Sequence, residues 1–280
     1  PNLATQNMTG TIDGFVALNG PLKHPKLTGK ISLDRINNPD FELYDMSGSL
    51  SADNKDTDDP YSISLAKLQI DRLKVRKLSI NDVGGKIQVQ LPVSTGKADQ
   101  VLAPQIVLSD VTARMAGGLV KVDGNFDLAK NSLAMNAYLS KIQMDELMDK
   151  LLSAPNEMTG VMDGEVHITT HGTNDKEIVT NLEGTADVSV VDGVVARFGQ
   201  LQTKLTQANL LSSGILGFNL NNLLQSVAPF RSGEFNELTS RYQIYKGILT
   251  VKELKFSGDD LRMWGAGTAS LPAGVLEIDI

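Results

Sequence analysis

Apolar and polar residues alternate along most of the chain. In the segment 12–18, Ile12, Val16 and Leu18 share one phase of a period-two pattern. The same period recurs in later segments, with these apolar positions in phase: Ile31 and Leu33; Ile87, Val89 and Leu91; Val120, Val122, Phe126 and Leu128; Met135 and Leu139; Val166 and Ile168; Val188 and Val190; Leu276, Ile278 and Ile280. Successive side chains of a β-strand point to opposite faces of a sheet, so this period predicts strands with one apolar and one polar face.

Turn signals separate the predicted strands. They lie at residues 37–40, at Asp123-Gly124, at Asp192-Gly193 and at Lys246-Gly247. Closely spaced strands joined by short turns are typical of an antiparallel meander and not of βαβ units. The pattern therefore predicts a mainly β protein.

Two regions break this rhythm with helical spacing. Apolar residues at i, i+3, i+4, i+7 and i+8 predict an amphipathic helix near 143–153, which ends before Pro155. A second helical region is predicted within 196–228, in one or two pieces. Two interpretations are open: the helices cover the end of a sheet, or they plug or gate a groove.

One strand–turn–strand unit occurs twice. Residues 8–14 read Met-Thr-Gly-Thr-Ile-Asp-Gly, and residues 158–164 read Met-Thr-Gly-Val-Met-Asp-Gly. Each copy is followed by a second strand centred on a glycine, at Gly29 and at Gly184. A repeated unit without catalytic residues indicates an architecture that grows by adding strands and acts through a long surface.

Composition excludes several classes of function. The net charge of -7 disfavours a nucleic-acid partner, because phosphate binding needs clustered Lys and Arg. The chain has no cysteine, which excludes thiol catalysis, disulfides and Cys-ligated metals. Aromatic residues make up only 5%, which is low for a compact enzyme built around a pocket. No apolar run is long enough for a membrane-spanning helix.

Candidate catalytic and metal-binding residues do not form a recognisable site. His167 and His171 are four residues apart, but they lie in an alternating run where that spacing does not suit zinc on a helix. The Asp-rich segment 51–60 lacks the spacing, glycine and terminal Glu of an EF-hand. No nucleophile elbow, P-loop or dinucleotide-binding motif is present. We therefore predict that the protein is not an enzyme and uses no metal or other cofactor.

The order of motifs resembles the C-terminal region of the AsmA family of Gram-negative envelope proteins. The resemblance covers 113–280 closely and 1–112 more loosely, which suggests a groove-repeat segment 1–112 and an AsmA-like region 113–280. The motifs that carry it are Gly117-Gly118 with the strand after it, the helical segment from Lys141 to Met148, the second Met-Thr-Gly copy, Gly184, Asp192-Gly193, and the tail segments 233–238, 245–247 and 265–271.

The resemblance implies both a fold and a role. The expected fold is a long, strongly bent antiparallel β-sheet that forms an open apolar groove, similar in design to chorein-type lipid bridges, with two or three short helices. The expected role is lipid transport in the periplasm: the protein would be anchored to the inner membrane by a segment outside this sequence and would carry phospholipid towards the outer membrane. A non-catalytic scaffold for outer-membrane protein assembly, with an envelope protein as partner, is the alternative.

The apolar phase supplies the expected lining of the groove. Alternation alone does not distinguish an open groove from a filled core. The predicted lining residues are Ile12, Val16, Leu18, Ile31, Leu33, Ile87, Val89, Leu91, Val120, Val122, Phe126, Leu128, Met135, Leu139, Val166, Ile168, Val188, Leu276 and Ile278.

Overall fold

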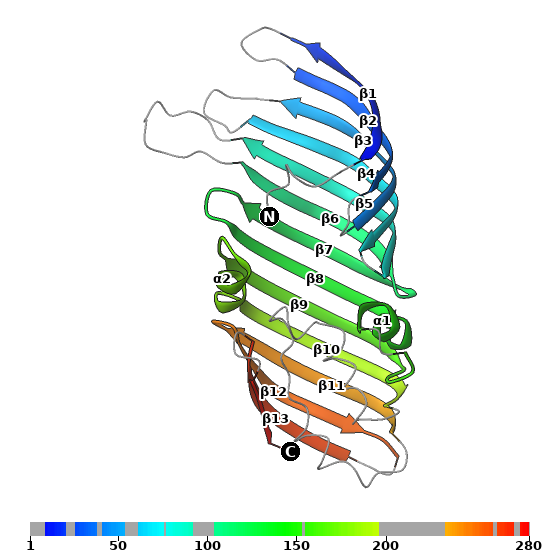
Figure 1. The fold of residues 1–280 in the computed structure, drawn as a ribbon, viewed down its shortest axis with the longest axis vertical. Helices are drawn as coiled ribbons and strands as arrows, with labels where there is room; N and C mark the ends of the chain where they lie inside the picture. The colour runs from blue at the N-terminus through cyan, green and yellow to red at the C-terminus, as the bar shows by residue number, and fades with distance from the viewer. Residues whose placement is uncertain are drawn as a thin grey trace. The chain divides into compact units, whose positions relative to one another are not determined.

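The computed structural model describes residues 9–20, 26–37, 41–53, 61–75, 77–91, 104–152, 155–195, 233–259, 262–271 and 275–279. Strands dominate these residues, and two short helices interrupt them (Figure 1). The strands are β1 (Thr9–Asn19), β2 (Lys26–Asn37), β3 (Phe41–Asp53), β4 (Tyr61–Val75), β5 (Leu78–Leu91), β6 (Gln105–Met115), β7 (Gly118–Asp127), β8 (Ser132–Gln143), β9 (Val161–His171), β10 (Glu183–Val194), β11 (Glu234–Tyr245), β12 (Ile248–Ser257), β13 (Arg262–Ser270) and β14 (Val275–Asp279). The helices are α1 (Met144–Leu152) and α2 (Asp175–Thr180).

The chain forms two compact units. The first comprises Pro1–Met115 and Val120–Leu133, and the second comprises Ala116–Leu119 and Ala134–Ile280. Within each unit, neighbouring strands are consecutive in the chain and pair antiparallel. This is the predicted antiparallel meander, an open sheet in which short connections join adjacent strands.

The apolar phases of the first unit meet on one face of its sheet. Ile12 lies opposite Leu33, and Leu33 lies opposite Met46 on the next strand. Ile70 of β4 lies opposite Val83 of β5, and both side chains are buried. Partly buried residues surround this pair and the buried Leu68: Leu43, Met46, Leu65, Ile80, Ile87, Val111 and Ala113. Register therefore aligns the apolar positions into continuous rows across the strands.

Residues in left-handed conformation interrupt the strands of the first unit. Asp45, Lys67, Asp82 and Asp110 have φ values of 49° to 52° although they lie within strands. The strand register shifts close to Lys67 and Asp82, as at β-bulges. Bulges bend a strand and increase its twist, and Asp is one of the few residue types that tolerates positive φ. These positions therefore help to curve the strands.

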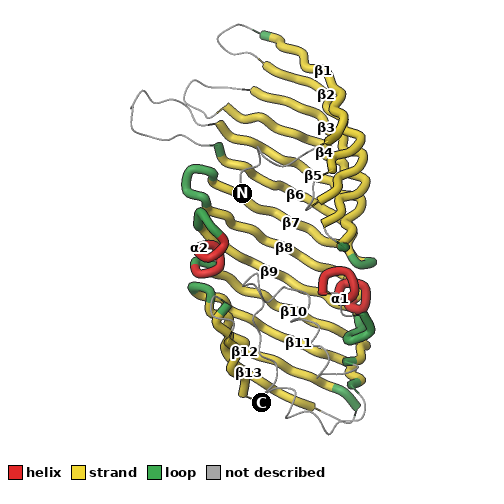
Figure 2. Tube along the Cα trace, in the orientation of Figure 1, coloured by secondary structure: helices red, strands yellow, loops and turns green. Residues whose placement is uncertain are grey.

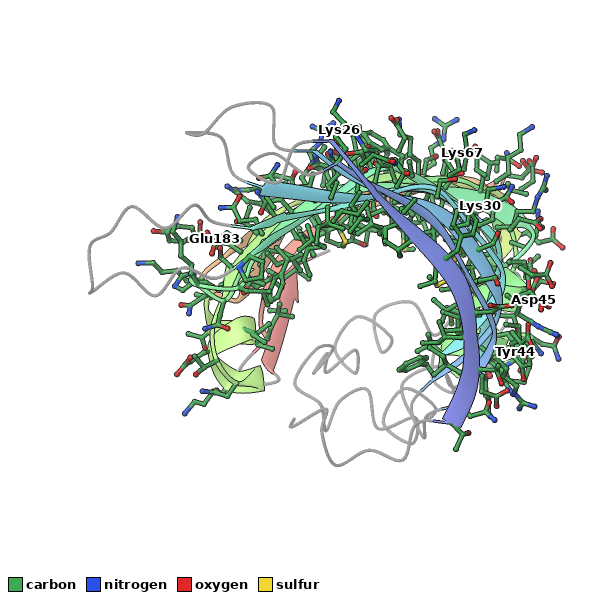
Figure 3. All side chains as sticks on the ribbon, turned by 90° about the horizontal axis from the view of Figure 1, so that it is seen from above. Lys26, Lys30, Tyr44, Asp45, Lys67 and Glu183 are labelled. Atoms are coloured by element: carbon green, nitrogen blue, oxygen red, sulfur yellow. The ribbon has the colours of Figure 1, made fainter. Side chains whose placement is uncertain are left out.

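Polar side chains of the first unit lie on the convex face of its strands. Figure 3 shows Lys26, Lys30, Tyr44, Asp45 and Lys67 projecting outward from the curved strands. The apolar rows described above occupy the opposite, concave face. The period-two pattern is thus converted into one polar and one apolar face.

In the second unit, α1 packs at the end of β8 (Figure 2). Its Met144 and Met148 are buried, and Ile142, just before the helix, is fully buried. The Met144 N–H donates a hydrogen bond of 3.0 Å to the Gly160 carbonyl oxygen. The apolar stripe predicted from sequence is therefore the packed face of this helix.

The shorter helix α2 lies between β9 and β10. The Asn174 side chain caps it by accepting the Glu177 N–H, and the Glu177 carboxylate accepts the Thr173 N–H and hydroxyl hydrogens. Residues around its C-terminal end, Val179 and Leu182, pack against a buried cluster of Leu249, Ala269 and Leu271. This helix was not predicted, because six residues are too few to show helical periodicity.

The structure confirms some of the sequence predictions and corrects others. Lys246-Gly247 is a turn, as predicted, but Asp123-Gly124 lies within β7 and Asp192-Gly193 within β10. Those two Asp-Gly pairs were wrongly predicted as turns, because the dipeptide also occurs inside continuous strands. The helix predicted near 143–153 is confirmed as α1. The helical region predicted within 196–228 lies outside the described residues.

Candidate functional site

The candidate functional site is the apolar face of the sheet, considered in each unit separately. In the first unit, Ile87 lies opposite Leu65 and Leu108, and Val89 lies opposite Ile63 and Ile106. Aliphatic side chains therefore continue from strand to strand along this face. Such a surface buries hydrocarbon in proportion to its area and fixes no single orientation of a ligand.

The apolar face of the second unit is built in the same way. Val188 lies between Gly164 and Ser240, and Ala186 lies between Val166 and Tyr242. Glycine is required beside this row, because a Cβ atom at Gly184 would collide with the His167 carbonyl oxygen. The small residues bring neighbouring strands close and leave the larger side chains to form the surface.

The structure places most predicted lining residues on these two faces. Those in β1, β2 and β5 are Ile12, Val16, Leu18, Ile31, Leu33, Ile87 and Val89; those in β7 are Val120, Val122 and Phe126; those in the second unit are Met135, Leu139, Val166, Ile168 and Val188. Leu91 lies in β5, opposite Tyr61. Leu276 and Ile278 lie in β14, opposite Ala269 and Gly267. Leu128 lies in the turn after β7, so its assignment to a strand was wrong.

The predicted lining does not form a closed core. Of the predicted lining residues whose burial the structure describes, only Leu33 is buried. Ile12, Val16 and Leu18 expose 67%, 59% and 65% of their surface, and the others are mostly half-buried. A packed interior would bury side chains of this size. The apolar face is accessible over most of these positions.

Charged residues form cross-strand networks on the polar face. In the second unit, Arg241 Nε lies 2.7 Å from Asp187 Oδ1, and Glu253 forms an ion pair with Lys255. The hydrogen bond from Lys255 and its charge hold the pKa of Glu253 below its usual value. These exposed pairs stabilise the fold only weakly, and they keep this face polar and solvated.

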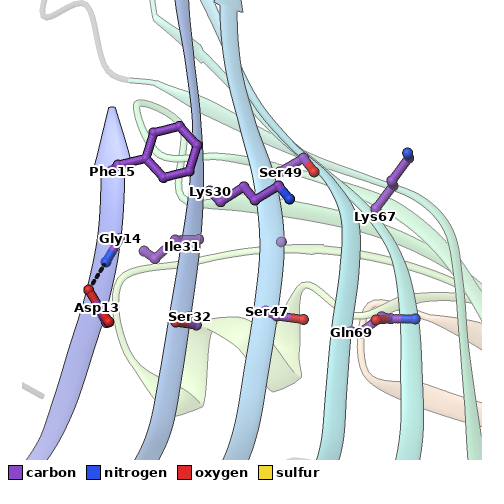
Figure 4. A pocket seen from close by; sticks show the side chains of 11 residues that line it. Asp13, Gly14, Phe15, Lys30, Ile31, Ser32, Ser47, Ser49, Lys67 and Gln69 are labelled. Carbon is purple, nitrogen blue, oxygen red and sulfur yellow. Dashed lines mark hydrogen bonds between the residues drawn. The ribbon is translucent and has the colours of Figure 1, made fainter. Parts of the chain in front are cut away.

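The polar face of the first unit carries a shallow hollow (Figure 4). One row across β1 to β4 consists of Asp13, Ser32, Ser47 and Gln69. The next row consists of Phe15, Lys30 and Ser49, and Lys67 of β4 lies beside it at a register shift. Asp13 Oδ1 accepts only the Gly14 N–H among these residues, at 2.7 Å. Serine hydroxyls and charged side chains line the hollow, as is usual for a solvated sheet face.

His167 lies on the polar face of the second unit. His167 Nδ1 lies 2.8 Å from Asn136 Oδ1, and its Nε2 lies 2.6 Å from Glu165 Oε1. In the described ranges of the chain, no group of three or more His, Asp or Glu side chains is placed to hold a metal ion. Within those same ranges, no helix is both long and apolar enough to cross a bilayer.

Sequence reasoning missed a recurrent contact between neighbouring strands. Asp123 Oδ1 accepts the N–H of Asp110 at 2.7 Å, and Asp163 Oδ1 accepts the N–H of Lys141 at 3.1 Å. Both donors have positive φ and lie in the strand that precedes the acceptor strand. An Asp-Gly pair inside an alternating run, rather than between two runs, is the sequence signal that could have revealed this contact.

Comparison with known proteins places the chain in a family. A model of the AsmA family matches residues 10–254, which is most of the chain and includes parts of both units. Searches of curated proteins and of solved structures found no match.

Proposed function

The chain belongs to the AsmA family, whose members are associated with the cell envelope, and from this premise we propose that it carries phospholipid acyl chains along its apolar face. The proposed setting is the periplasm, where lipid moves between the inner and outer membranes. The observation that supports this proposal is the accessible apolar face itself. Half-buried aliphatic side chains such as Val122 and Val188 line it.

The energetic need for such a face is large. Each methylene group exposed to water costs about 0.8 kcal/mol, so an unshielded phospholipid with two acyl chains would pay roughly 20 kcal/mol or more. An aliphatic surface offsets much of this cost, while the charged headgroup stays in water. The apolar rows of both units supply this kind of surface.

Movement requires that no position hold the lipid too tightly. The apolar face repeats similar aliphatic contacts from strand to strand, and the described residues show no cluster of polar groups on it that would fix a headgroup. Methionines such as Met46 and Met162 add side chains that adapt to different chain shapes. Many weak and equivalent contacts allow an acyl chain to slide along the face.

A pair of substitutions on β10 tests this proposal. Val188→Asp places a charge on the apolar face, whereas Thr185→Asp places the same charge on the polar face of the same strand. We expect Val188→Asp to lower lipid transfer between donor and acceptor vesicles at least about tenfold, because a carboxylate among acyl chains is unfavourable. Thr185→Asp should transfer lipid at the rate of the unsubstituted protein.

The same pair distinguishes lipid transport from a scaffold role. Both variants are first compared with the unsubstituted protein by circular dichroism, to show that the strands remain. Equal transfer by the two folded variants would contradict the proposal. Mass spectrometry of the purified protein gives a second readout: bound phospholipid is expected in Thr185→Asp and should be depleted in Val188→Asp.

A further inference from the structure

The left-handed residues inside strands of the first unit are each followed by an apolar residue of one packed cluster. The four pairs are Asp45-Met46, Lys67-Leu68, Asp82-Val83 and Asp110-Val111. Leu68 and Val83 are buried, and Met46 and Val111 pack against the same cluster. The irregular positions of β3 to β6 therefore meet in one packed crease on the apolar face. In the second unit, the left-handed Lys141 precedes Ile142, which is fully buried.

In each unit, an aspartate of the next strand holds one of these left-handed residues. Asp123 Oδ1 accepts the Asp110 N–H at 2.7 Å, and Asp163 Oδ1 accepts the Lys141 N–H at 3.1 Å. The register between β5 and β6 shifts at Asp110, and the extra residue of a bulge has no partner in the ladder. The Asp123 carboxylate supplies the acceptor that this N–H needs.

The crease is also a place of close approach between two backbones. A Cβ atom at Gly85 of β5, which has a φ of 151°, would lie 2.7 Å from the Val111 Cα atom of β6. A side chain larger than hydrogen therefore does not fit there. The bend is built into the backbone of these strands and not only into their side-chain packing.

The bend determines how much of an acyl chain the apolar face covers. A hydrocarbon chain on a flat face keeps its far side and both flanks in water, whereas a concave face also covers the flanks. Hydrophobic stabilisation is proportional to the apolar area removed from water, so the gain per methylene group rises with curvature. These gains add up along the chain, and curvature therefore sets how lipid binding changes with chain length.

From these observations we infer that Asp110 and Lys141, held by Asp123 and Asp163, set the acyl-chain-length preference of the apolar face. They are positioning residues, because their side chains are exposed and they act through the backbone conformation of the bend. This role presupposes the proposed function and adds to it a determinant of which phospholipids bind. The bent face retains long acyl chains that a flatter face of the same composition would release.

A matched pair of substitutions at position 110 separates backbone conformation from charge. Asp110→Gly and Asp110→Val both remove the carboxylate that Lys121 contacts at 2.8 Å, but only glycine adopts positive φ at little cost. Each protein is incubated with vesicles of phospholipids that share one headgroup and differ in chain length, and mass spectrometry quantifies the bound lipids. The ratio of long-chain to short-chain lipid should fall at least about threefold in Asp110→Val, because lost shielding accumulates over the additional methylene groups. Asp110→Gly should keep the ratio of the unsubstituted protein.

A milder pair gives the same test if Asp110→Val does not fold. Asp123→Ala removes the acceptor of the Asp110 N–H, whereas Asp123→Asn keeps an amide oxygen there. Asp123→Ala should lower the ratio of long-chain to short-chain lipid, and Asp123→Asn should restore it. Circular dichroism of both variants shows whether the strands remain.

A purely structural role for these residues predicts a different outcome. Asp110→Val and Asp123→Ala would then reduce all bound lipids by the same factor and leave the ratio unchanged, which would overturn the inference without contradicting lipid transport. An equal fall of the ratio in Asp110→Gly and Asp110→Val would assign the effect to charge and overturn it as well. Absence of phospholipid from the unsubstituted protein would instead contradict the proposed function itself.

Discussion

The strands β1 and β9 begin with nearly the same sequence but lie in different surroundings. Ile12 in β1 exposes 67% of its surface, whereas Met162 at the equivalent position in β9 exposes 7%. Val16 exposes 59%, while the equivalent Val166 is half-buried. The difference follows from the neighbours: β9 lies between β8 and β10, and β1 has only β2 beside it among the described strands. Similar local sequence therefore gives the same strand but not the same burial.

This comparison separates what local sequence determines from what its context determines. The alternation and the Asp-Gly pair produce a strand with one apolar face in both copies. The energetic value of each apolar residue depends instead on which strands flank it. An apolar residue that contributes to stability in β9 is available for binding in β1.

The largest expected difference in the free energy of unfolding is between Met162→Ala and Ile12→Ala. Removing the buried Met162 side chain should lower the free energy of unfolding by about 2–5 kcal/mol. Removing the exposed Ile12 side chain should change it by less than about 0.5 kcal/mol. Urea denaturation followed by circular dichroism measures both values. Similar losses for the two variants would show that β1 is packed as tightly as β9.

A smaller difference in stability loss is expected between Gly14→Ala and Gly164→Ala, and here the larger loss is expected in β1. A Cβ atom at Gly14 would lie 2.7 Å from the Lys30 carbonyl oxygen, whereas one at Gly164 would lie 3.1 Å from the Asp187 carbonyl oxygen. Gly14→Ala should therefore cost about 1–3 kcal/mol, because backbone must shift to relieve the clash. Gly164→Ala should cost less than about 1 kcal/mol. A larger loss of stability for Gly164→Ala than for Gly14→Ala in urea denaturation would contradict the close spacing of β1 and β2 at Gly14.

The smallest expected difference in the free energy of unfolding is between Asp163→Ala and Asp13→Ala, the two equivalent aspartates of the repeat. Asp163→Ala removes the acceptor of the Lys141 N–H and should lower the free energy of unfolding by about 0.5–1.5 kcal/mol. It should also accelerate amide exchange at Lys141. Asp13→Ala, whose acceptor serves only the adjacent Gly14 N–H among the described residues, should leave the stability of the isolated protein nearly unchanged. Equal losses in the free energy of unfolding for Asp163→Ala and Asp13→Ala would show that Asp13 also accepts an inter-strand hydrogen bond in the isolated protein.

Much of the fold could be predicted from sequence because period two is a strong local signal. The strands that contain Ile87, Val122 and Val188 follow directly from alternation, and α1 follows from its apolar stripe. The Asp-Gly pairs at 123–124 and 192–193 were wrongly predicted as turns, because the dipeptide is a common turn signal but here lies inside strands. Inter-strand contacts such as that of Asp163 depend on a residue in another strand, so the local pattern could not reveal them.

The candidate site was predictable in outline for the same reason. Alternation identified which residues share a face, and register confirms that Ile87 and Val89 lie in line with apolar residues of β4 and β6. Alternation could not show how exposed they are. The contrast between the buried Leu33 and the exposed Ile12, which face each other across β1 and β2, depends on the neighbouring strands.

Photo-crosslinking of lipid tests the central claim most directly. A photoreactive amino acid is placed at Ile87 or Val188 on the apolar face, and at Gln88 or Thr185 on the polar face, in protein mixed with phospholipid vesicles. After irradiation, mass spectrometry should find phospholipid attached at Ile87 and Val188 and little at Gln88 and Thr185. Equal attachment on both faces, or attachment to protein alone, would contradict transport along the apolar face.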